Sequence, residues 1–184
     1  MVKLIIVTTG LPGSGKGTFA TVAKELRIPV LVMGDVVRNE VMKRGLELTP
    51  ENIRYVARQL RIEEGPVAVA KRIAERLREM KECAVLIDGV RSMEEVKLFK
   101  EFGKVVVISI EAPFEIRLNR ILKRGRVDDV NEEELRKRDE MELSLGIARV
   151  MDQAEIIIEN TSTLDEFISK SKEVLIDLLK KYCN

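Results

Sequence analysis

The chain has 184 residues, 45% of them hydrophobic, and a formal net charge of +1. This length suits one domain spanning 1–184, and the near-neutral charge gives no overall attraction to nucleic acid or anionic membranes. The sequence contains no histidine, which excludes histidine-dependent acid–base, nucleophilic and metal chemistry. The apolar stretch near the N-terminus is too short for a signal peptide or a membrane span, so we expect a cytoplasmic protein.

Short apolar runs rich in valine and isoleucine alternate with segments of helical periodicity. The runs predict five strands at 3–9, 28–33, 83–88, 104–110 and 154–160. The helical segments between them include 18–26, 35–45, 49–65 and 65–80, and two capping boxes begin at Ser92 and Thr163. This alternation predicts an α/β fold, a doubly wound five-stranded parallel sheet. Ligands of such sheets bind beyond the carboxyl ends of the strands, which places loops 10–18, 34–38, 88–92 and 160–163 on one rim.

The two cysteines cannot build a structural zinc site by themselves. Cys83 begins the third predicted strand, and Cys183 is the penultimate residue. We expect both to be reduced thiols. A disulfide between them is the alternative, because some heat-adapted intracellular proteins contain them.

The first predicted strand runs into GLPGSGKGT and then a helix, which is the context of a phosphate-binding loop. Backbone N–H groups of such a loop form a nest for anions, and the N-terminus of the helix adds positive potential. Lys16 would reach the β- and γ-phosphates of a nucleotide. The alternative is a glycine turn with a surface lysine. The predicted ATP-binding residues here are Gly10, Leu11, Pro12, Gly13, Ser14, Gly15, Lys16, Gly17 and Thr18.

The pattern G-x-P-G-x-G-K-G-T resembles the adenylate kinases and related nucleoside monophosphate kinases. The resemblance implies a P-loop NTPase fold of that type, with ATP and Mg²⁺ as cofactors. Gly17 stands where the strict pattern has a magnesium-binding hydroxyl, and Thr18 follows it. We therefore expect Thr18 and Asp88, which ends the third strand, to hold the metal.

Two further motifs resemble the acceptor side of these kinases. In VMGDVVRNEV the resemblance implies that Gly34 and Asp35 lead a helix, capped by Asp35, whose Arg38 grips the acceptor phosphate. DGVRS implies acceptor contacts from Gly89 and Arg91, although it lacks the aromatic residue and proline of adenylate kinases. The helical acceptor-binding segment would span about 35–80. The alternatives are a local Asp35–Arg38 ion pair and a plain surface turn.

Residues 117–138 are rich in arginine, and Arg117, Arg120 and Arg124 share one helical face. Composition alone indicates a solvated surface. The order of the arginines resembles the mobile lid of monophosphate kinases, here very short, and the resemblance implies that lid arginines stabilise the transferred phosphoryl group. The catalytic residues expected on this basis, with Lys16 and Asp88, are Arg120, Arg124, Arg126, Arg136 and Arg138.

The last predicted strand and its loop, AEIIIENTSTLDEF, resemble the dephospho-coenzyme A kinases, which implies that Asn160 borders the ATP adenine. A plain strand-to-helix cap is the alternative. As a whole the chain resembles an archaeal family of P-loop proteins related to adenylate and dephospho-coenzyme A kinases.

These resemblances imply a small-molecule kinase that transfers the γ-phosphate of ATP to an acceptor bearing a phosphate. AMP or another nucleoside monophosphate is the first candidate acceptor, and dephospho-coenzyme A is the second. The alternative function is a nucleotide-dependent binding switch or weak ATPase that acts with an RNA or protein partner.

Overall fold

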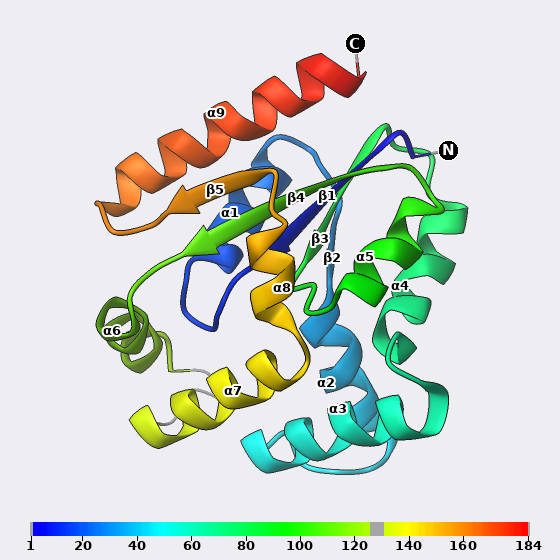
Figure 1. The fold of residues 1–184 in the computed structure, drawn as a ribbon, viewed down its shortest axis with the longest axis vertical. Helices are drawn as coiled ribbons and strands as arrows, with labels where there is room; N and C mark the ends of the chain where they lie inside the picture. Colours follow the sequence, from blue (N-terminus) through cyan, green and yellow to red (C-terminus); the bar gives the residue numbers. More distant parts are fainter. Residues whose placement is uncertain (1, 126–130, 184) are drawn as a thin grey trace.

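A computed structural model describes residues 2–125 and 131–183. Its centre is a five-stranded sheet in the order β2-β3-β1-β4-β5, in which all neighbouring strands are parallel (Figure 1). The strands are β1 (Leu4–Thr9), β2 (Val30–Val32), β3 (Ala84–Asp88), β4 (Lys104–Glu111) and β5 (Ile156–Glu159). The predicted α/β fold with a five-stranded parallel sheet is confirmed.

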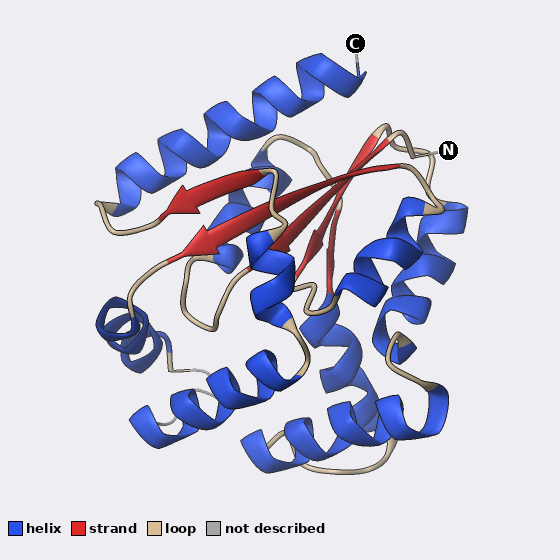
Figure 2. Ribbon diagram, viewed as in Figure 1, coloured by secondary structure: helices blue, strands red, loops and turns tan. Residues whose placement is uncertain are grey.

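Helices, drawn blue in Figure 2, cover both faces of the red sheet. The helices are α1 (Lys16–Glu25), α2 (Met33–Lys43), α3 (Pro50–Glu64), α4 (Ala68–Glu79), α5 (Met93–Lys100), α6 (Phe114–Arg124), α7 (Glu132–Ser144), α8 (Ile147–Asp152) and α9 (Leu164–Cys183). Side chains alternate between the two faces of each strand. Leu4 and Ile6 of β1 therefore pack with α1 and α9, whereas Ile5 and Val7 pack with α2–α5 and α8.

Local sequence signals account for most of the helix boundaries. Thr49 caps α3 ahead of Pro50, and Gly45 follows α2 with a positive φ of 72°. Both predicted capping boxes form, with Ser92 and Glu95 at α5 and with Thr163 and Glu166 at α9.

Some boundaries were predicted wrongly. Met33 opens α2 instead of ending a strand, α4 begins at Ala68 rather than at Pro66, and the six-residue helix α8 was not predicted. Because α2 begins two residues before Asp35, this aspartate lies in the first turn and does not cap the helix.

The expectation of two reduced thiols was also wrong. A disulfide joins Cys83, just before β3, to Cys183 at the end of α9. The two cysteines are 100 positions apart, so no local signal pairs them: only the packing of α9 along the sheet brings them together. None of the described helices is both long and apolar enough to cross a membrane.

Candidate active site

A cleft of about 780 Å³ opens at the carboxyl ends of the strands. The four loops predicted to share one rim all line it: the glycine loop after β1, the start of α2 after β2, the turn after β3 and the loop after β5. Lys16, Arg38 and Arg91 are among its lining residues. The structure therefore brings the predicted nucleotide loop and the predicted acceptor arginines to one cleft.

The glycine loop follows a path that side chains would obstruct. Gly13 and Gly15 have φ values of 81° and 118°, in the left-handed region that L-residues avoid. A Cβ atom at Gly15 would also collide with the side-chain amide of Asn160. The two glycines allow the backbone to curve tightly ahead of α1.

The carbonyl oxygens of this loop are bound by side chains from distant elements. Arg117 Nη1 of α6 donates to the Pro12 oxygen at 3.0 Å, and the Asn160 amide donates to the Ser14 oxygen at 2.8 Å. Arg120 also donates to the Ser14 oxygen, and it donates to the backbone and side-chain oxygens of Asn160. With the carbonyls held in this way, the N–H groups at the start of α1, which have no acceptor within the helix, are the groups left to bind an anion.

Lys16, the first residue of α1, is the cation at the centre of this loop. Its ammonium donates to the carbonyl oxygens of Gly10 and Leu11, at 2.6 and 3.1 Å. Burial lowers the pKa of Lys16 to about 8, although the carboxylates of Asp88 and Glu142 oppose this shift. An anionic ligand would favour the protonated lysine, so Lys16 is suited to bind phosphate.

Asp88 ends β3 at the floor of the cleft, with 9% of its surface exposed. The Thr8 hydroxyl donates to its Oδ1 at 2.7 Å. Thr18 lines the same cleft. A carboxylate and a hydroxyl are hard oxygen ligands, which fit Mg²⁺ when phosphate oxygens and water complete its coordination. Among the residues that the structure describes, no group of three or more His, Cys, Asp or Glu could hold a metal ion, so a metal at Asp88 would depend on such additional ligands.

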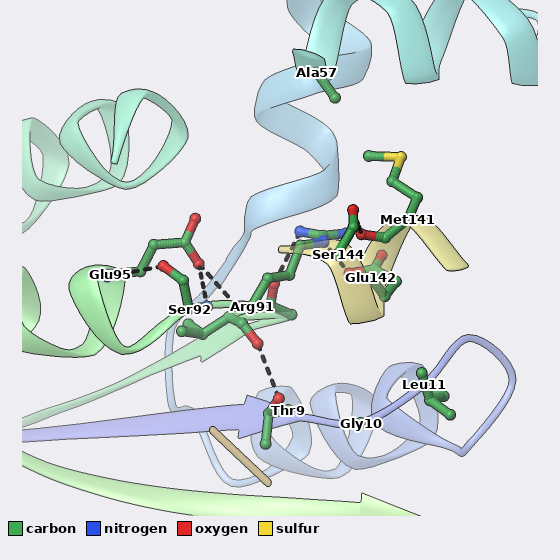
Figure 3. Close-up of polar contacts among 12 residues, drawn as sticks. Thr9, Gly10, Leu11, Ala57, Arg91, Ser92, Glu95, Met141, Glu142 and Ser144 are labelled. Carbon is green, nitrogen blue, oxygen red and sulfur yellow. Dashed lines mark hydrogen bonds and ion pairs between the residues drawn. The ribbon is translucent and has the colours of Figure 1, made fainter. Parts of the chain in front are cut away.

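Next to the cleft lies a smaller cavity of about 60 Å³, here called the arginine cavity. Its walls come from α2, α3 and α7, and Arg91 lies between them (Figure 3). The side chains of five arginines line it together with one carboxylate: Arg38, Arg54, Arg61, Arg91, Arg138 and Glu142. The rest of its lining is Gly34 and apolar residues, including Ala57 and Met141. The cavity suits a ligand with negative charge.

The arginine cavity and the cleft share part of their lining. Gly34, Arg38, Arg91, Arg138 and Glu142 line both, so the two spaces adjoin at these residues. An anion bound in the cleft and an anion bound in the arginine cavity would therefore lie close together, with guanidinium groups between them.

Arg91 is held by a carboxylate that the sequence analysis did not consider. Its Nε donates to Glu142 of α7 at 2.6 Å, and its Nη1 donates to the Gly89 oxygen (Figure 3). Glu142 is 7% exposed. An acceptor phosphate that binds Arg91 would have to compete with this carboxylate.

Arg38 forms the local ion pair that the sequence left open as an alternative. Its Nη2 lies 2.6 Å from Oδ1 of Asp35, one turn earlier on α2. The Asp35 side chain is 58% exposed, so this pair is worth little and does not prevent Arg38 from lining both spaces.

The predicted lid arginines lie in different environments. Arg120 binds the glycine loop, and Arg124 and Arg138 line the cleft. Arg136 does not line it: this arginine pairs with Glu132 and stacks on the Phe114 ring at 4.4 Å. Arg126 and the length of the lid turn fall outside the described residues.

Arg117, which the sequence analysis placed on the lid face, is buried and structural. Besides its bond to Pro12, it forms a bidentate ion pair with Asp139 of α7, at 2.7 and 2.9 Å. Four further residues of the site were not predicted from the sequence: Asp139, Glu142, Arg54 and Arg61. The spacing of Arg54, Ala57 and Arg61 on one stripe of α3 was the available signal, but charged residues on an amphipathic helix ordinarily face solvent.

Comparisons with known proteins agree with this architecture. Residues 9–136 match a family model described as an AAA domain. Two solved structures share the fold at 20% sequence identity: TT1252 from Thermus thermophilus, with a TM-score of 0.66 over 97% of this chain and 99% of that one, and shikimate kinase from Acinetobacter baumannii in complex with shikimate, with a TM-score of 0.54 over 100% and 97%.

Archaeal proteins are similar over nearly the whole chain. A UPF0200 protein of Methanosarcina mazei is 48% identical over 179 residues, which cover 96% of each protein. A UPF0200/UPF0201 protein of Archaeoglobus fulgidus is 46% identical over 181 residues, which are 96% of this chain but only 56% of that longer protein. The chain therefore belongs to the archaeal UPF0200 family and carries its nucleotide-binding loop within an AAA domain.

Proposed function

We propose that the protein is an ATP- and Mg²⁺-dependent kinase that transfers the γ-phosphate to a small acceptor bearing its own phosphate. The observation that carries this proposal is that two spaces adjoin, one lined by the glycine loop and the other by arginines. Phosphoryl transfer to an acceptor that bears a phosphate brings two anions close together, and their charges must be compensated. A neighbour of the same fold is named shikimate kinase, which agrees with a phosphotransferase.

Each group has a part in positioning or charge compensation. The N–H groups at the start of α1 and Lys16 bind the phosphates of ATP, and Arg38 and Arg91 hold the acceptor. Arg124 and Arg138 line the cleft, and their role in this proposal is to compensate the charge that spreads over the transferring oxygens. Asp88 and Thr18 would hold Mg²⁺, which when bound neutralises charge on the phosphates.

The acceptor is a nucleoside monophosphate such as AMP in the first instance, and dephospho-coenzyme A in the second. When a phosphate oxygen is the nucleophile, no general base is needed, which agrees with the absence of histidine. For a hydroxyl acceptor such as dephospho-coenzyme A, Asp35 is the candidate base, and its carboxylate lies beside Arg38 in the cleft.

The test is to incubate the protein with ATP, Mg²⁺ and a panel of nucleoside monophosphates and dephospho-coenzyme A, and to detect the phosphorylated acceptor. Arg38→Gln should weaken acceptor binding about ten- to a hundredfold, because it removes a charged hydrogen bond worth about 1.5–3 kcal/mol. ATP affinity should change little. Lys43→Gln, at an exposed position near the end of α2, is the matched control. Equal loss of ATP and acceptor binding in Arg38→Gln would contradict the assigned roles.

A nucleotide-dependent switch or weak ATPase is the second candidate. The observation in its favour is that the arginine cavity, as lined by the described residues, has no neutral polar side chain with which to read a nucleobase. ATP hydrolysis with no phosphorylated acceptor, together with salt-sensitive RNA binding, would support this function over the first.

A further inference from the structure

Two arginines of the arginine cavity have no part in the transfer described above. Arg54 and Arg61 line this cavity but not the cleft, whereas Arg38, Arg91 and Arg138 line both. Arg54, Ala57 and Arg61 form one stripe of α3, on which the two arginines are about 10 Å apart along the helix axis. Arg54 is paired with Glu134 of α7. Arg61 is the deeper of the two, since its side chain is 13% exposed and that of Arg54 is 25% exposed.

Arg61 forms an ion pair with Glu95, but few of its N–H donors are hydrogen-bonded. Only one hydrogen bond of its guanidinium is found among the described residues, from Nη1 to the backbone oxygen of Ala57. In the ion pair, its Nη2 lies 3.8 Å from Oε1 of Glu95, beyond hydrogen-bond distance. Burial lowers the pKa of Arg61, although Glu95 opposes this shift.

The carboxylates near Arg61 also bind other groups. Glu95 is 1% exposed and accepts hydrogen bonds from the backbone N–H groups of Arg91 and Ser92 in the capping box of α5 (Figure 3). Glu142 is bound to Arg91. Because Arg61 lines the cavity, a ligand there would bind its remaining donors beside the Glu95 ion pair, and an arginine can bind a carboxylate or a phosphate through two parallel hydrogen bonds.

We propose that Arg61 forms a second anion subsite at the end of the arginine cavity remote from the glycine loop, so that the acceptor carries a second anionic group besides the phosphate held by Arg38 and Arg91. This inference rests on the proposed function and limits the acceptor to molecules with two anionic groups. The apolar side chains of Val37, Ile53 and Met141 would contact the part of the molecule between the two anions. The second anion is a carboxylate or a phosphate, and the two are distinguished by matched ligands.

The experiment measures ligand binding by calorimetry to the full chain saturated with a non-hydrolysable ATP analogue, so that the cleft is filled. One ligand pair is AMP and adenosine 3′,5′-bisphosphate, which differ by a phosphate. The other pair is glycerol 3-phosphate and 3-phosphoglycerate, of which the second carries a carboxylate in addition to its phosphate. In one of the two pairs, we expect the ligand with two anionic groups to bind at least tenfold more tightly than the ligand with one.

Arg61→Gln should abolish that preference, while Arg58→Gln should retain it. Arg58 is the matched control because it is an exposed arginine on the same helix. Thermal unfolding checks that Arg61→Gln is folded. If Arg61→Gln is not folded, Arg61→Lys takes its place. Lysine keeps the positive charge but cannot form two parallel hydrogen bonds, so this variant should reduce the preference for the two-anion ligand severalfold.

The proposal is overturned if neither pair shows a preference, or if Arg61→Gln keeps one. Failure of the kinase function gives a different result. Arg61-dependent binding without phosphorylation of any acceptor would refute the kinase and leave the subsite, whereas phosphorylation of AMP with no preference in either pair would refute the subsite and leave the kinase.

Discussion

The glycine loop and the arginine cavity both suit anions, but they offer different kinds of hydrogen-bond donor. The loop offers backbone N–H groups whose positions are fixed by glycines and by side chains bound to the loop's carbonyls, such as Arg117 and Asn160. The cavity offers guanidinium groups that come from separate elements, and several already hold a carboxylate. A ligand of the loop meets backbone N–H groups that are already in place, whereas a ligand of the cavity competes with the carboxylates paired with Arg38, Arg54 and Arg91.

This difference has a consequence for energetics. A preorganised backbone site loses little free energy to rearrangement when its ligand binds. In the cavity, an entering anion gains the guanidinium of Arg91 only if Glu142 gives it up. The affinity of the cavity for an anion therefore depends on how strongly the Glu142 carboxylate competes with that anion for Arg91.

The largest expected effect comes from removing Arg117, one of the side chains that bind the carbonyl oxygens of the glycine loop. Arg117→Ala should lower the free energy of unfolding by about 3–5 kcal/mol, because it leaves the Asp139 carboxylate and the Pro12 carbonyl without their buried partner. Urea unfolding measures the loss, and Lys123→Ala, an exposed position on α6, is the control. A cost below about 1 kcal/mol would mean that the loop does not depend on Arg117.

The next effect tests the titration of the loop's cation. Since the pKa of Lys16 is lowered to about 8, ATP affinity should fall as the pH rises above 8, up to about tenfold per pH unit, because the ammonium loses its proton. Calorimetry between pH 7 and 9.5 measures this fall. Lys16→Arg, which stays charged, should bind with no such slope; a slope that persists in this variant would assign the titration to another group.

The same lowered pKa affects stability in a defined direction. Between pH 8 and the ordinary lysine pKa of 10.5, the unfolded chain binds a proton that the folded protein does not. The contribution of Lys16 to the free energy of unfolding therefore rises with pH across this range.

The smallest effect tests competition within the cavity. Glu142→Gln should tighten the binding of a phosphate-bearing ligand about three- to tenfold, because the amide keeps the shape of the side chain but competes less well for Arg91. Glu140→Gln, exposed on the same helix, makes the same change in net charge and is the control. Weaker binding in Glu142→Gln would instead indicate that the carboxylate positions Arg91 for the ligand.

The sequence alone determined the features that depend on local chemistry. The five apolar runs predicted the parallel sheet, since strands covered on both faces need continuous apolar character. The glycine loop was predictable because its spacing of Gly13, Gly15 and Lys16 reflects backbone constraints within a few residues. The capping boxes at Ser92 and Thr163 were predictable for the same reason.

Only the tertiary structure decided which charged side chains meet. The pairs Arg91–Glu142, Arg117–Asp139 and Arg54–Glu134 join residues 51, 22 and 80 positions apart, and the Cys83–Cys183 disulfide spans 100. The sequence pattern of an amphipathic helix is the same whether its charged residues face solvent or a cavity, so the pattern does not distinguish the two cases. Only the packing of the helices against one another supplied that information, and the arginine cavity formed by α2, α3 and α7 is its result.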